Sequence, residues 1–137
     1  MGRSSYGTLS RGAWILTGLL ALAWLGLEDR GVGAVALLAW MTCLSGLLTA
    51  RARRGLGGTG PRPMGLRWWV PAGVAAGVGV APLAVLLILI KVGLHAHPVP
   101  DFTTADVAAV LARMPVWVIA GGFLGAGGAL MERAAWT

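Results

Sequence analysis

The stretch WWVPAGVAAGVGVAPLAVLLILI, Trp68–Ile90, decides the fold of this chain. It holds no charged residue and exceeds the ~20 apolar residues that a helix needs to cross the hydrocarbon core of a bilayer. Pro71 suits the first turn of a helix, where its missing N–H costs nothing, and Pro82 is expected to kink the segment. The stretch therefore predicts a transmembrane helix over residues 69–91.

The composition of the whole chain agrees with a membrane environment. Apolar residues make up 57% of the 137 residues and charged residues only 12%, against about 25% in an ordinary soluble domain. A water-soluble protein of this length cannot bury so much apolar surface, because its ratio of surface to volume is too high. We therefore expect the lipid bilayer to be the solvent and residues 1–137 to form a single membrane domain.

Three further apolar segments complete an all-α integral membrane protein with four transmembrane helices. The predicted spans are residues 12–27, 32–50, 69–91 and 115–131, with a short amphipathic helix over residues 103–113. Thr103 or Thr104 can cap this short helix, and Asp106 suits the positive end of its dipole. Residues 51–67 are rich in arginine, glycine and proline, so they predict a loop that joins two helical hairpins. Arg51, Arg53 and Arg54 are expected to end the second helix.

The distribution of basic residues predicts the orientation of the four spans. An even number of spans puts both termini on the side of the loop over residues 51–67. That side carries Arg3, Arg11, Arg51, Arg53, Arg54, Arg62, Arg67 and Arg133, and the other side carries Arg30, Lys91 and Arg113. Positive residues remain in the cytoplasm, so the N- and C-termini are expected to be cytoplasmic, in a bacterial inner or thylakoid-type membrane. The net charge of +6 thus reflects topology, and we expect no nucleic-acid partner.

Glycine spacing indicates where helices approach each other. Gly73 and Gly77 form a GxxxG pair in the third span, and Gly121 and Gly125 form another in the fourth. Small residues at this spacing let two backbones come close. These four glycines are the predicted helix-packing positions.

The stretch KVGLHAHPVPDF, residues 91–102, groups most of the polar side chains that could hold a ligand. His95, His97 and Asp101 lie together there, and imidazole can contact a pigment, haem or quinone. The chain has no third histidine, so we predict no metal site. The simpler interpretation is the polar end of a helix, with Lys91 extending its ammonium group toward the headgroups.

The chain offers little material for catalysis or for coupled transport. No acidic residue occurs between Gly31 and Ile90, and no phosphate-binding loop or metalloprotease motif is present. We therefore expect no enzyme, and favour an accessory or structural subunit of a larger membrane complex, of respiratory or photosynthetic type. The alternative is a small homo-oligomeric channel or transporter for a neutral or anionic solute. A third reading, an enzyme or metal-handling protein, would need His95, His97 and Asp101.

Overall fold

A computed structural model describes residues 3–27, 31–56, 64–95 and 102–135, and in these ranges the protein is helical with no strand. The helices are α1 (Arg3–Gly26), α2 (Val32–Leu56), α3 (Leu66–His95), α4 (Thr104–Ala112) and α5 (Met114–Ala134). All except α4 are long and apolar enough to cross a membrane. The architecture is consistent with an integral membrane protein that has four spans.

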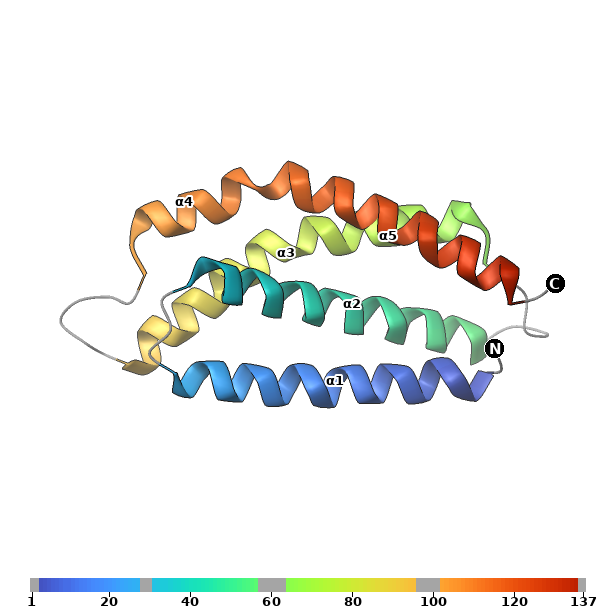
Figure 1. Ribbon diagram of the computed structural model, residues 1–137, viewed down its shortest axis with the longest axis horizontal. Coiled ribbons are helices and arrows are strands. Elements are labelled where there is room, and N and C mark those ends of the chain that lie inside the picture. The colour runs from blue at the N-terminus through green and yellow to red at the C-terminus, as the bar shows by residue number, and fades with distance from the viewer. Residues whose placement is uncertain (1–2, 28–30, 57–63, 96–101, 136–137) are drawn as a thin grey trace.

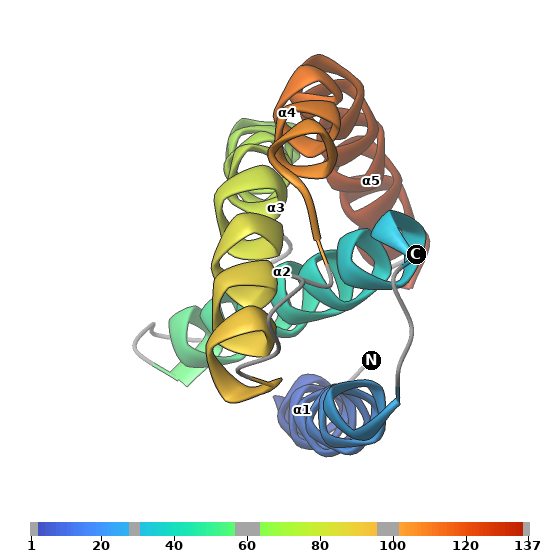
Figure 2. The same ribbon diagram turned by 90° about the vertical axis from the view of Figure 1, so that its left-hand side faces the viewer.

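The four long helices form an open layer in the order α1, α2, α3, α5 (Figures 1 and 2). α3 packs most extensively against α5, while α2 packs against α1 and α3. α2 also meets α5, where the rings of Trp40 and Trp117 are in contact. Viewed along the helices, α1 and α5 lie at opposite edges (Figure 2). The two edge helices are the least buried: 17% of the residues in the apolar part of α1 and of α5 are buried. The corresponding shares are 28% for α2 and 33% for α3.

All four long helices extend beyond the apolar segments from which they were predicted, and α3 covers Leu66–His95 instead of residues 69–91. α1 begins at Arg3 instead of residue 12, and α5 continues to Ala134. The expectation that Arg51, Arg53 and Arg54 end the second helix is wrong, because α2 continues to Leu56. Arginine is a good helix former, and basic side chains in the last turn favour the negative end of the helix dipole.

The main apolar core lies toward one end of the layer, around the second half of α3. Its buried members come from the four helices α1 to α4 and from Phe102, two residues before α4: Trp24, Val35, Leu38, Ala39, Val80, Ala81, Ala84, Ile88, Phe102 and Val110. The buried face of α3 runs through Trp69, Gly73, Gly77, Val80, Ala84, Ile88 and Lys91. Steps of three and four residues keep these positions on one side of a helix. We call the two ends of the layer the Lys91 end and the Arg51 end.

A capping box begins α4. Thr103 is the N-cap residue, and its hydroxyl accepts from the Asp106 backbone N–H at 3.3 Å. In return, a side-chain oxygen of Asp106 accepts from the Thr103 backbone N–H at 2.8 Å. Arg113 alone separates α4 from α5, and Pro115 stands in the first turn of α5, where it removes no helical hydrogen bond.

Acidification is expected to loosen the start of α4. Hydrogen bonds from the Thr103 backbone N–H and hydroxyl lower the pKa of Asp106. The charged form therefore stabilises the fold above the ordinary aspartate pKa of about 3.9, and this contribution is lost as the pH falls through the lower folded value. Hydrogen exchange in α4, corrected for intrinsic rates, should show more opening at pH 3 than at pH 6. Asp106→Asn should remove the difference, and equal protection of the unmodified protein at both pH values would contradict the prediction.

Candidate functional site

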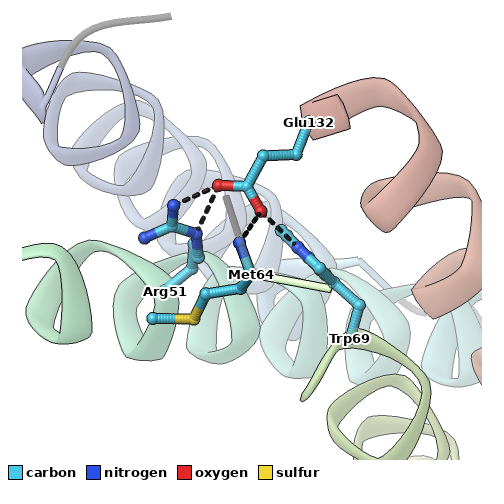
Figure 3. A network of polar contacts seen from close by, with 4 residues as sticks. All are labelled: Arg51, Met64, Trp69 and Glu132. Carbon is cyan, nitrogen blue, oxygen red and sulfur yellow. Dashed lines mark hydrogen bonds and ion pairs between the residues drawn. The ribbon is translucent and has the colours of Figure 1, made fainter. Parts of the chain in front are cut away.

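A buried ionic network occupies the Arg51 end (Figure 3). One carboxylate oxygen of Glu132 accepts from Arg51 Nε at 2.9 Å and also pairs with Arg51 Nη2. The other oxygen accepts from Trp69 Nε1 at 2.7 Å and from the Met64 backbone N–H at 3.0 Å. The side chains of Arg51 and Glu132 are only 7% and 2% exposed. The carboxylate is therefore surrounded by donors and withdrawn from water.

Glu132 lies on the face of α5 that packs against α3, and this position brings its carboxylate into the network. Gly121, Gly125, Gly128 and Glu132 follow one another at steps of four, three and four residues, so they share one side of the helix. A Cβ atom at Gly128 would lie 2.8 Å from Cε3 of Trp69. Because glycine has no side chain, the indole ring of Trp69 can lie against Gly128. In this position its Nε1 donates to Glu132.

Arg51 links the network to the first helix. Its guanidinium lies 5.0 Å from the centre of the Tyr6 ring, within range of a cation–π interaction. The four contributing side chains come from α1, α2, α3 and α5. Because each carboxylate oxygen already has two donors, the arrangement holds the helix ends together.

Close backbone packing joins α3 and α5 beside the network. A Cβ atom at Gly73 would lie 2.9 Å from the backbone nitrogen of Gly125, and one at Gly121 would lie 3.1 Å from that of Gly77. Each of the four predicted packing glycines faces backbone atoms of the other helix. Side chains at these places would force the helices apart, so the glycines set the separation of α3 and α5.

Hydroxyl groups join α1 and α2. Ser10 and Thr49 share a hydrogen bond of 2.7 Å, Thr17 and Ser45 share one of 3.3 Å, and Trp14 Nε1 donates to Thr49 at 2.9 Å. Ser45 and Thr49 also donate to carbonyl oxygens four residues earlier in α2. These groups satisfy one another, as polar groups in an apolar helix pair must.

Lys91 does not extend to water as the sequence suggested. Its side chain is fully buried, and Nζ donates to the carbonyl oxygens of Trp24 at 3.3 Å and Leu27 at 2.8 Å. The ammonium also lies 4.3 Å from the centre of the Trp24 ring. Carbonyls at the C-terminus of a helix lack helical partners and attract a cation. Through these hydrogen bonds Lys91 links the last turns of α3 to the C-terminal end of α1.

The predicted ligand residues fall largely outside the described ranges. His95 is the last residue of α3, and only its backbone is described, whereas His97, Asp101 and Arg62 lie beyond the described residues. A pigment, haem or quinone contact at His95 and His97 stays a prediction. Within the ranges described, no group of three histidine, cysteine or acidic residues could hold a metal ion.

The sequence-based reasoning missed the Arg51–Glu132 pair. From the sequence, Arg51 was assigned only to the basic side of the membrane and to the end of the second helix, and Glu132 was assigned no role. The signal for Glu132 is its position on the same helical face as Gly121, Gly125 and Gly128.

Comparisons with protein-family models, with curated proteins and with solved structures found no match to this chain.

Proposed function

We propose that this protein is an accessory subunit of a larger membrane complex, of respiratory or photosynthetic type. The observation that supports the proposal most is the open layer, which leaves both edge helices largely uncovered. The outward side of α1 carries a row of exposed large side chains, among them Ile15, Leu19 and Leu22 at 66%, 61% and 69% exposure. A helix of this kind presents a long apolar surface for packing against a neighbour in the bilayer.

The polar groups of the described ranges also favour a structural role. Arg51 and Glu132 hold helix ends together, Lys91 binds the end of α1, and the hydroxyls of α1 and α2 bond to each other. Such groups organise a scaffold and do not form a reaction centre. We further propose two helical hairpins, α1–α2 and α3–α5, with the Arg51 end and both termini in the cytoplasm of a bacterial inner or thylakoid-type membrane.

Gentle extraction from native membranes tests the subunit proposal. A tagged protein is purified in a mild detergent, and its partners are quantified by mass spectrometry together with the mass of the particle. We expect a particle far above the 14.1 kDa of the chain that contains a second membrane protein at fixed stoichiometry. A particle built only from copies of this chain would instead favour the channel or transporter alternative, and solute flux in liposomes would then be measured.

Photo-crosslinking locates the partner surface. A crosslinking residue at Leu22, on the exposed side of α1, should capture the partner in intact membranes. The matched control is Ala21, the preceding residue, which packs against the core and should give only crosslinks within the chain. Equal capture of the partner from both positions would contradict a partner on the outward side of α1.

A further inference from the structure

A small open pocket lies between the start of α3 and the last turns of α5. It has a volume of about 160 Å³ and is lined by Met64, Gly65, Leu66, Ala129, Leu130 and Arg133. This is below the roughly 300–1,000 Å³ of pockets that enclose a drug-sized molecule. The pocket is suited to part of an amphiphile, such as a headgroup.

The charge around this pocket is positive. Arg133 contributes the only charged side chain of the lining, and Arg67 directly follows the lining residue Leu66 in the chain. In the part of the chain that the structure describes, Glu132 is the one carboxylate at this end, and it is already paired with Arg51. An anion beside Arg133 therefore meets a guanidinium without a competing free carboxylate nearby.

The apolar side of the pocket continues along α5 into the membrane-spanning surface. Leu130 lines the pocket and is 63% exposed. Phe123, Ile119 and Val116 follow on the same helical face at 75%, 60% and 60% exposure. A molecule with a negative head at Arg133 would thus find a strip of apolar surface for its tail.

We propose that this pocket binds the phosphate headgroup of an anionic phospholipid, with an acyl chain lying along the outward face of α5. A basic group at the membrane boundary, an apolar wall and a continuous apolar strip are what such a lipid requires. Free phosphate would match only the guanidinium and would leave the apolar wall unused. The inference is independent of the proposed role as an accessory subunit.

Native mass spectrometry of the delipidated protein tests the site. The protein is titrated with phosphatidylglycerol and, separately, with phosphatidylcholine of the same acyl chains. We expect one phosphatidylglycerol to bind about fivefold or more tightly than phosphatidylcholine, the scale of one basic residue at a charged membrane surface. Arg133→Gln should remove this preference, whereas Arg53→Gln, an exposed arginine outside the pocket, should change it less than twofold.

A second variant blocks the pocket without changing its charge. A Cβ atom at Gly65 would meet no atom within 4 Å, so Gly65→Leu can fill the space with little strain. It should weaken phosphatidylglycerol binding while circular dichroism and elution volume stay unchanged. Equal affinity for the two lipids, equal effects of the Arg133 and Arg53 variants, or displacement of the lipid by millimolar inorganic phosphate would each overturn the proposal.

Discussion

Gly125→Ala is expected to lower the free energy of unfolding by about 1–3 kcal/mol, the usual cost of inserting a methyl group into a tightly packed interior. The added Cβ would lie 2.8 Å from the backbone carbonyl carbon of Trp69 and 2.9 Å from Cα of Val70. Backbone atoms cannot turn aside as a flexible side chain can, so α3 and α5 must separate. Separation also draws Trp69 away from Glu132.

The matched control for this variant is Gly127→Ala on the same helix. A Cβ atom there would meet no atom within 4 Å, so no helix has to move. Alanine is the better helix former, and the free energy of unfolding should stay the same or rise by up to about 1 kcal/mol. The measurement is an unfolding titration with sodium dodecyl sulfate in mixed micelles, followed by tryptophan fluorescence and circular dichroism. Equal losses in the two variants would contradict the prediction, because they would show that the contact between α3 and α5 at Gly125 does not decide the outcome.

Hydropathy made the four long helices predictable because lipid demands that a spanning segment satisfy its own backbone hydrogen bonds. Helix ends were harder to predict, because α1 and α2 continue as helix into polar and basic residues where hydropathy falls. Glycine spacing marked the positions that face backbone in the structure. It did not identify the partner helix, since a chain with 22 glycines contains many pairs of similar spacing.

The helical periodicity also indicates on which face of its helix each buried charge lies, which a hydropathy average does not. Lys91 follows Val80, Ala84 and Ile88 on the buried face of α3, so it points toward the neighbouring helices. Glu132 likewise follows Gly125 and Gly128 on the packed face of α5. The sequence therefore predicts that the side chains of Lys91 and Glu132 point toward neighbouring helices. The partner of each charge depends on how distant helices are arranged, and no local pattern determines that arrangement.

Glu132→Gln is expected to lower the free energy of unfolding by about 3–5 kcal/mol, because it leaves the Arg51 guanidinium buried without its counter-charge. Glutamine keeps an oxygen that can accept from Trp69 Nε1 or the Met64 backbone N–H. The loss therefore reports mainly the missing charge. The same unfolding titration measures it, and Arg53→Met, on an exposed arginine of α2, should change the value by no more than about 0.5 kcal/mol.

A double-mutant cycle separates the ion pair from the rest of the network. Arg51→Met should cost a similar amount, since it leaves the Glu132 carboxylate with only the Trp69 and Met64 donors. The combined variant removes both charges, so neither is left buried and unpaired. Its loss should fall short of the sum of the two single losses by at least about 1 kcal/mol. Strictly additive losses would contradict a direct interaction between the two side chains.

The size of this coupling also bears on what the network does for the protein. A buried ion pair often contributes little net stability compared with an apolar pair of similar volume, because desolvating two charges is expensive. Its effect is then on specificity: the guanidinium can be satisfied only where the end of α5 meets the end of α2 in this arrangement. Alternative packings of the four long, glycine-containing helices would leave one or both charges unpaired in an apolar environment. A combined variant that stays folded and loses the fixed α2–α5 distance, measured between spin labels, would show this role directly.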